Sequence, residues 1–289
     1  MDTRTKGKIT FVIILLIIFG IFFHIRGSSL FFFKKYHSKS VYVMDNFGKK
    51  VKGKNESEKL PPASLTKLLT ALTAKEKIEN LQELVPIDVE SYKKMVAKNS
   101  SMAGFYGKEY VTYEDLLAGL LLASGGECAG TLAISTYGSR DAFVQRMNEK
   151  AKELGCENSY FTNPEGMDDE EMVTTAKDMA ILLKAVFDDP ELGHIITQKT
   201  YQSVSSLDHP QGLTIVSTVL GTIQEGEIKE GSIVGGKSGT TDLAGLCWAT
   251  ILKKDDKIYF AVTMGAPYQN IKNHELYQKE DTIKLLDSL

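Results

Sequence analysis

A serine and a lysine three residues apart, Ser64 and Lys67, are the pair in this chain best suited to covalent chemistry. At the start of a helix this spacing places both side chains on one face, so the hydroxyl can hydrogen-bond the amine. A neutral lysine can accept the hydroxyl proton if burial and nearby cations depress its pKa. The spacing therefore predicts Ser64 as a nucleophile and Lys67 as its base.

The same spacing occurs a second time, at Ser91 and Lys94. That second copy lies among polar residues and has no apolar helix behind it. Ser64 instead follows a Pro-Pro-Ala sequence and opens an apolar helical pattern over residues 64–77. We interpret the copy at Ser91 as a chance match.

A third serine, Ser124, precedes two glycines at a break between two apolar helical stretches. Its hydroxyl could relay a proton between the lysine and a leaving group. The alternative is a glycine-rich turn between helices in which Ser124 is a cap. The residues alone leave both interpretations open.

The segment Gly235–Thr240 ends a predicted strand. Lys237 in this segment could bind a substrate carboxylate, and the glycines allow close approach of the backbone. An exposed strand edge would supply N–H groups to an extended peptide or an oxyanion. The alternative is a glycine-rich hairpin with an incidental lysine.

In this order the three segments resemble the Ser-x-x-Lys, Ser-x-Asn and Lys-Thr-Gly motifs of penicillin-binding proteins and serine β-lactamases. More closely, the chain resembles the low-molecular-weight serine D-alanyl-D-alanine carboxypeptidases, over roughly residues 41–266. Several matching blocks have no catalytic duty, which argues against a chance assembly of motifs. The blocks are 62–70, 120–125, 143–144, 147–151, 154–155, 161–167, 175–180 and 236–241.

The resemblance implies a two-step acyl transfer. Ser64 would attack the penultimate D-alanine carbonyl of a peptidoglycan stem peptide while Lys67 takes the proton. Ser124 would join the proton relay, and water would hydrolyse the acyl-enzyme. β-Lactams would acylate Ser64 and stay attached. The oxyanion would lie between the N–H groups of Ser64 and Thr240, and the implied substrate-binding residues are Lys237, Ser238, Gly239 and Thr240.

Two positions depart from the family motifs. Ser238 replaces a threonine and retains a hydroxyl. Gly126 replaces an asparagine that hydrogen-bonds the lysine and a substrate amide, and losing such a contact would cost ~1–3 kcal/mol. Three outcomes stay open: another group replaces the amide, the substrate differs, or activity is weak.

Other functions remain as alternatives. A degenerate relative would hold peptidoglycan or penicillin without turnover. A serine β-lactamase would need a glutamate beside the deacylating water, for which Glu165 is the candidate, although it lies in a carboxypeptidase-like block. A zinc peptidase finds no support in the spacing of the histidines. We expect no metal or other cofactor, and the net charge of −3 gives no basic field for nucleic acid.

The N-terminus predicts a membrane location. Residues 9–25 are almost wholly apolar and follow a short basic leader. As a helix they would reach about 25 Å, near the short limit for a bilayer span. No small-residue cleavage site follows, which favours a single-pass signal anchor over a secreted protein. We expect leader and anchor over residues 1–26, a stalk over 27–39 and an extracytoplasmic catalytic domain over 40–289.

The body predicts one α/β domain with a β-lactamase/D,D-peptidase-like fold. Strand patterns near both ends of the body indicate an antiparallel sheet built from both chain ends, with a helical cluster between them. The three cysteines are odd in number and far apart in sequence, so no disulfide framework follows and at least one thiol is free unless it pairs between chains. The favoured interpretation is that they are small buried hydrophobic residues. Strands are expected at 41–44, 49–54, 233–237, 245–252 and 258–264, and helices at 64–77, 113–123, 127–137, 139–154, 174–187 and 273–289.

Overall fold

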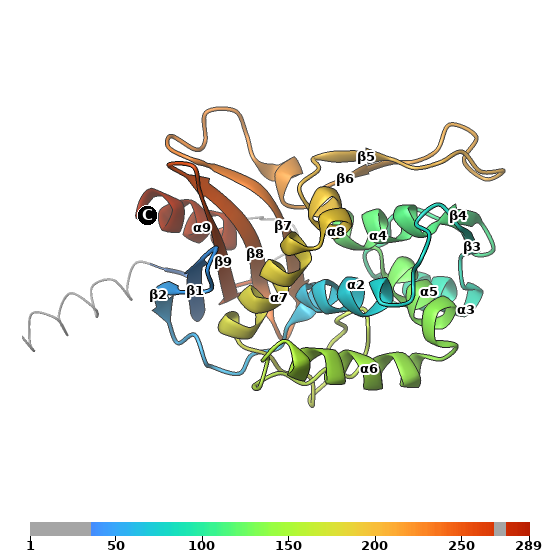
Figure 1. The fold of residues 1–289 in the computed structure, drawn as a ribbon, viewed down its shortest axis with the longest axis horizontal. Coiled ribbons are helices and arrows are strands. Elements are labelled where there is room, and N and C mark those ends of the chain that lie inside the picture. Colours follow the sequence, from blue (N-terminus) through green and yellow to red (C-terminus); the bar gives the residue numbers. More distant parts are fainter. Residues whose placement is uncertain (1–35, 269–275) are drawn as a thin grey trace, which may run out of the picture. The chain divides into compact units, whose positions relative to one another are not determined.

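The computed structural model describes residues 36–268 and 276–289. Contacts gather Ser38–Leu289 into one compact unit, which contains a five-stranded sheet and a group of helices (Figure 1). The predicted anchor over residues 9–25 and most of the predicted stalk lie outside the described residues. Within the described part of the chain, no helix is long and apolar enough to cross a bilayer.

The main sheet joins the two ends of the body, as the sequence predicts. Its strand order is β2-β1-β9-β8-β7, and every neighbouring pair is antiparallel. The first strand therefore lies beside the last, with Ser40 opposite Met264. β7 forms one edge of this sheet. The strands are β1 (Ser40–Asp45), β2 (Lys50–Lys54), β7 (Ser232–Thr241), β8 (Gly245–Lys254) and β9 (Lys257–Ala266).

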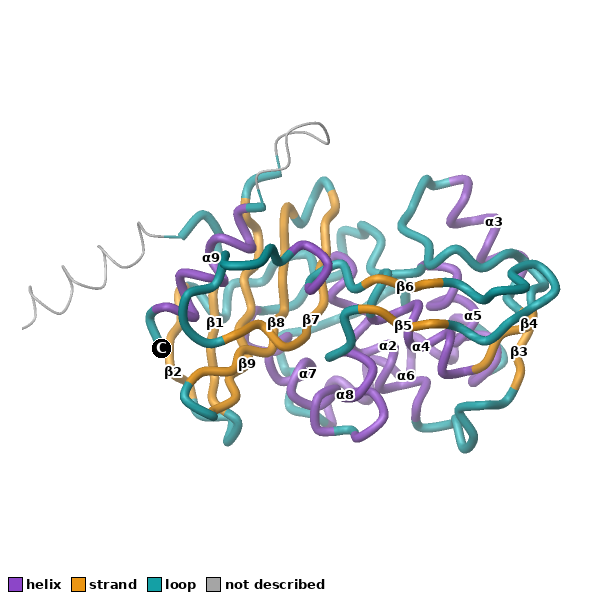
Figure 2. Tube along the Cα trace, turned by 90° about the horizontal axis from the view of Figure 1, so that it is seen from above, coloured by secondary structure: helices purple, strands orange, loops and turns teal. Residues whose placement is uncertain are grey.

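Two helices cover opposite faces of this sheet, as the views in Figures 1 and 2 show together. One is α7 (Ala176–Asp188), which packs against β1, β8 and β9. The other is α9 (Tyr277–Asp287), which packs against β8 and β9. β8 and β9 are buried along most of their length because side chains on both faces meet a helix layer.

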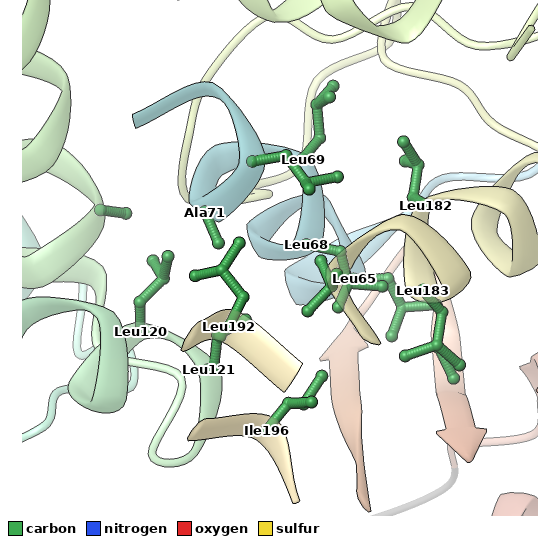
Figure 3. Close-up of a cluster of buried hydrophobic side chains, with 14 of the residues drawn as sticks. Leu65, Leu68, Leu69, Ala71, Leu120, Leu121, Leu182, Leu183, Leu192 and Ile196 are labelled. Carbon is green, nitrogen blue, oxygen red and sulfur yellow. The ribbon is translucent and has the colours of Figure 1, made fainter. Parts of the chain in front are cut away.

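The helical cluster surrounds α2 (Lys67–Lys75), in which all residues except the last are buried. A helix that is apolar all round packs at the centre of a domain. Figure 3 shows leucines of α2, α4, α7 and α8 meeting in one core. This burial fixes α2, and therefore the turn before it, in place. The remaining helices of the cluster are α4 (Tyr113–Leu121), α5 (Gly126–Tyr137), α6 (Arg140–Glu153) and α8 (Pro190–Ile196).

Several elements differ from the sequence prediction. The helix expected from residue 64 begins as a 3-10 turn, η1 (Ala63–Thr66), and Lys67 opens α2. The strand expected to stop at residue 237 continues to Thr241 because its pairing with β8 persists through the glycine-rich segment. The predicted strand was therefore too short, but segment 235–240 does lie in the last part of β7, before the turn that leads to β8.

A helix also occurs where none was expected. α3 (Val89–Ala97) contains the second Ser-x-x-Lys copy, and Asp88 caps it by accepting a hydrogen bond from Ser91 N. Its apolar signal was weak because only Ser91 and Met95 are buried. The short elements β3 (Leu84–Pro86), β4 (Tyr110–Thr112), β5 (Thr200–Gln202), β6 (Thr214–Val216) and η2 (Leu220–Thr222) were not predicted either.

The three cysteines are buried, as the sequence predicts, and all three are free. Burial raises the pKa of Cys156 and of Cys247 to about 12, and the pKa of Cys128 is also raised. These thiols are therefore protonated small hydrophobic groups at neutral pH.

Candidate active site

Ser64 and Lys67 meet at the junction between η1 and α2. The Lys67 Nζ lies 3.0 Å from the Ser64 Oγ and also donates to the backbone oxygen of Glu165 at 2.6 Å. Lys67 is 3% exposed, whereas Ser64 is partly exposed. Ala63, just before the serine, has a left-handed φ of 47°. The pair that the sequence singles out is thus brought into contact, with the hydroxyl on the solvent side.

Burial lowers the pKa of Lys67 to about 8, against the opposing effect of the Glu165 and Glu127 carboxylates. Desolvation disfavours the charged ammonium, while nearby carboxylates favour it. With this pKa, about a tenth of the lysine is uncharged at pH 7. An uncharged amine within hydrogen-bond reach of a hydroxyl can act as its general base.

The loop after residue 162 holds Lys67 from the other side. Asn163 Oδ1 accepts from the backbone N–H groups of Gly166 and Met167, each at 2.9 Å. Thr70 of α2 donates to the Pro164 oxygen at 2.7 Å. Gly166 has a φ of +77°, and a Cβ there would lie 1.9 Å from the Ala63 oxygen. The loop is therefore pressed against the serine turn, and it presents the Glu165 carbonyl to the lysine.

The Glu165 side chain points to a different partner. Its carboxylate is 2% exposed, and both of its oxygens lie 2.6 Å from Nη2 of Arg140, at the start of α6. The Glu165 carboxylate, the candidate for activating the deacylating water of a β-lactamase, is therefore paired with Arg140 in the structure. Sequence reasoning missed Arg140, since nothing in the local pattern links it to residue 165.

The edge strand β7 packs directly against the serine turn. A Cβ at Gly239 would lie 3.0 Å from Ser64 N and 3.2 Å from the Ala63 Cβ. A larger residue at this position would push the strand away from the nucleophile. The next residue, Thr240, lines the cleft beside Ser64 and Lys67. The strand edge and the serine backbone are therefore neighbours, as an oxyanion site requires.

Of the seven predicted site residues, Ser64, Lys67 and Thr240 line the cleft, and the other four do not. Lys237 is fully buried and its Nζ donates to the Ser238 oxygen at 2.7 Å. Burial, aided by the charge of Lys67, holds the pKa of Lys237 well below its usual range. Ser238 donates to the Thr218 hydroxyl at 2.7 Å, and Ser124 is 5% exposed with a φ of 66°. The roles assigned to these side chains stay predictions.

The cleft itself has a volume of about 410 Å³ and mostly polar walls. Its lining includes Met95 of α3, the loop 98–101 and the loop 165–168. Residues 240–242 at the end of β7 and Tyr268 close it. Met95, the loop 98–101 and Tyr268 were not predicted because they come from segments distant in sequence from the motifs. Asp168 and Asp242 directly follow matching blocks and were not predicted either.

Gly126 has a structural reason to be glycine. A Cβ at this position would lie 2.3 Å from Met95 Sδ, so any larger residue would require the Met95 side chain of α3 to move. One turn later, a Cβ at Gly130 would lie 2.2 Å from the Ser91 Oγ. Glycines four residues apart thus let the two helices touch along one seam. The Met95 thioether lies beside the cleft, next to the position where the family motif has an asparagine amide. The Gly-x-x-x-Gly spacing of residues 126–130 was the signal in the sequence that could have predicted this close helix contact.

Among the described residues, no group of three His, Cys, Asp or Glu side chains is placed to hold a metal ion. The arrangement that the structure does contain is a serine–lysine pair on a turn between a buried helix and a sheet edge. Such a pair is equipped for acyl transfer without a metal ligand set.

Comparison with known proteins identifies the class. The profile of the D-alanyl-D-alanine carboxypeptidase family matches residues 31–268, so the chain belongs to this family. This confirms the resemblance inferred from the motif blocks. The computed fold is that of the penicillin-binding D,D-peptidases. It superposes on a mutant of the Streptomyces K15 DD-transpeptidase with a TM-score of 0.76 at 22% identity, covering 88% of this chain and 97% of that one.

Two curated relatives illustrate the range of the family. D-alanyl-D-alanine carboxypeptidase DacF of Bacillus subtilis is 27% identical over 84% of this chain and 65% of its own length. A D-alanyl-D-alanine endopeptidase of Pseudomonas aeruginosa is 32% identical over 60% of this chain and 54% of its own length. The chain thus spans less than two thirds of the length of these relatives.

Proposed function

We propose that this chain is a serine-type D-alanyl-D-alanine carboxypeptidase that removes the terminal D-alanine of peptidoglycan stem peptides. The observation that carries the proposal is the 3.0 Å contact between the buried Lys67 amine and the Ser64 hydroxyl at the edge of a polar cleft. Membership of the D-alanyl-D-alanine carboxypeptidase family supports the choice of substrate.

The reaction has two steps. Lys67 takes the Ser64 proton as the oxygen bonds to the penultimate D-alanine carbonyl carbon. The C–N bond then breaks, and the departing D-alanine amine receives a proton that passes from Lys67 through Ser124. Water adds to the acyl-enzyme as Lys67 accepts its proton, and the ester bond to Ser64 breaks as Lys67 returns that proton to the Ser64 oxygen. β-Lactams are expected to stop after the first step.

The remaining predicted residues would bind substrate. The backbone N–H groups of Ser64 and Thr240 are expected to hold the oxyanion, with Gly239 allowing their close approach. Lys237 is expected to help hold the terminal carboxylate of the substrate, as the family resemblance implies. Ser238 would contribute its hydroxyl.

The test is release of D-alanine from a synthetic stem pentapeptide. We expect the protein to release one D-alanine per peptide and the Ser64→Ala variant to fall to background. Acylation by penicillin without D-alanine release would instead favour a degenerate binding relative. Sustained hydrolysis of nitrocefin would favour a β-lactamase.

We also propose that residues 9–25 anchor the protein in the cell membrane with the catalytic body outside. The support is the apolar run beside a basic leader. The full chain should fractionate with membranes and resist carbonate extraction, whereas a variant lacking residues 1–26 should not. Release of the full chain into the medium would contradict an uncleaved anchor.

A further inference from the structure

Glu165 joins two cations through two different groups. Its backbone oxygen accepts a hydrogen bond from Lys67 Nζ at 2.6 Å, and its carboxylate accepts from Arg140 Nη2 at 2.6 Å. The main chain of this residue therefore touches the candidate base, while its side chain touches an arginine on α6. Glu165 and Arg140 both lie outside the three motifs.

The Arg140–Glu165 pair is enclosed. The Glu165 side chain is 2% exposed and that of Arg140 is 27% exposed. Arg140 Nη1 is buried over Gly130 of α5 and has no hydrogen-bond partner among the described residues. The two charges are thus matched to each other, and removal of either leaves the other uncompensated in a medium that screens it poorly.

The titratable groups facing Lys67 come from three directions. Glu165 lies on its loop, Glu127 and Cys128 lie on α5, and Lys237 lies on β7. Oε1 of Glu127 accepts hydrogen bonds from the backbone N–H groups of Ala103 and Gly104. Of the two carboxylates near Lys67, that of Glu165 is paired with the side chain of a cation, Arg140. The field that this carboxylate exerts on Lys67 is therefore set by Arg140.

We propose that Arg140 is a positioning residue for the acyl-transfer reaction, because it neutralises the Glu165 carboxylate and so lets the Lys67 amine lose its proton near neutral pH. This inference rests on the proposed role of Lys67 as base. Burial alone would favour the uncharged amine, but an unpaired carboxylate beside it would hold the proton. The arginine weakens that opposition without touching the lysine.

A purely structural role is the competing explanation. In that case the ion pair would only anchor the loop that carries the Glu165 carbonyl. Loss of an anchor lowers thermal stability and the maximal rate, but it does not move the pH midpoint of acylation in opposite directions for the two partners. The pH midpoint therefore separates the two roles.

The experiment measures the rate constant for acylation of Ser64 by a fluorescent penicillin as a function of pH. Arg140→Gln should move the midpoint up by about one pH unit, so that acylation at pH 7 slows about tenfold. Glu165→Gln should move the midpoint down, because it leaves Arg140 as an unpaired cation. The double variant should return close to the wild-type midpoint.

Two further variants serve as controls. Arg140→Lys keeps the charge and should keep the wild-type midpoint. Arg146→Gln removes another arginine of α6, which pairs with Glu76 and Glu153, and should also leave the midpoint unchanged. Melting temperatures of all variants report any loss of folding, and Glu165→Gln still gives a midpoint if Arg140→Gln does not fold.

The outcomes are distinguishable. Opposite shifts in the two single variants, cancelled in the double variant, support the proposal. Unmoved midpoints in folded Glu165→Gln and Arg140→Gln overturn it while leaving the proposed function intact. Absence of any acylation in the wild-type protein would instead overturn the proposed function.

Discussion

The two Ser-x-x-Lys copies have the same spacing and opposite environments. At Ser64 the lysine is buried and the serine is partly exposed at a cleft. At Ser91 the serine is 3% exposed, pressed against Gly130, while Lys94 is in solvent. Spacing sets which side chains share a helix face, but burial decides whether the lysine can act as a base.

The elements behind each copy explain the difference. Lys67 opens a helix that is buried on all sides, whereas α3 buries only Ser91 and Met95 against α5. The first pair also faces the edge strand β7 through Gly239. A functional pair therefore needs a central helix and an open strand edge in addition to the spacing.

The largest contrast is expected on removing each lysine. Lys67→Met should slow penicillin acylation of the protein by about a hundredfold to ten-thousandfold, because the general base is lost. Lys94→Met, the matched change in the second copy, should leave the rate unchanged. The measurement is the acylation rate with fluorescent penicillin, and equal effects of the two changes would remove the distinction between the copies.

The pH dependence gives the next largest effect. The pKa of Lys67 lies near 8, below its ordinary value, so the active uncharged amine gains population as pH rises. Acylation should increase about tenfold per pH unit below 8 and level off above it. A rate that stays flat from about pH 6 to about pH 9, or falls, would show that Lys67 is not the titrating base.

The smallest contrast concerns the α3–α5 seam. Gly126→Ala and Gly130→Ala each force a methyl group into closed packing, and each should reduce the free energy of unfolding by roughly 1–3 kcal/mol. Gly126→Ala should also slow acylation several-fold, since it displaces Met95 into the cleft. Gly130→Ala should leave acylation unchanged.

Urea unfolding and the acylation rate together check this pair. Met95→Ala should relieve the Gly126→Ala clash and restore part of the rate. If both glycine variants slow acylation equally, the result would contradict the claim that Gly126→Ala acts by moving Met95 into the cleft.

The sequence predicted the parts that depend on local patterns. Ser64 and Lys67 are three residues apart, and the strands at both ends of the body alternate with clear turns, so pair and sheet were predictable. Arg140 and Glu165 are 25 residues apart, and Met95 meets Gly126 across two helices. Such contacts depend on tertiary packing, which no local spacing encodes. The extent of β7 was missed because its glycines resemble a turn.

The burial of Lys237 could not be predicted from the sequence either. The sequence predicts that Lys237 could bind a substrate carboxylate, yet in the structure its buried amine donates to the backbone oxygen of Ser238. Its neighbour Thr240 lines the cleft instead. Which residues of an edge strand reach a cleft depends on how the strand meets the opposing turn, here through Gly239.

The most direct test of the central claim is peptide mapping by mass spectrometry after incubation with labelled penicillin. We predict a single adduct on Ser64 that Ser64→Ala abolishes and Ser91→Ala leaves intact. An adduct on Ser91, or none on the wild-type protein, would contradict the assignment of the nucleophile.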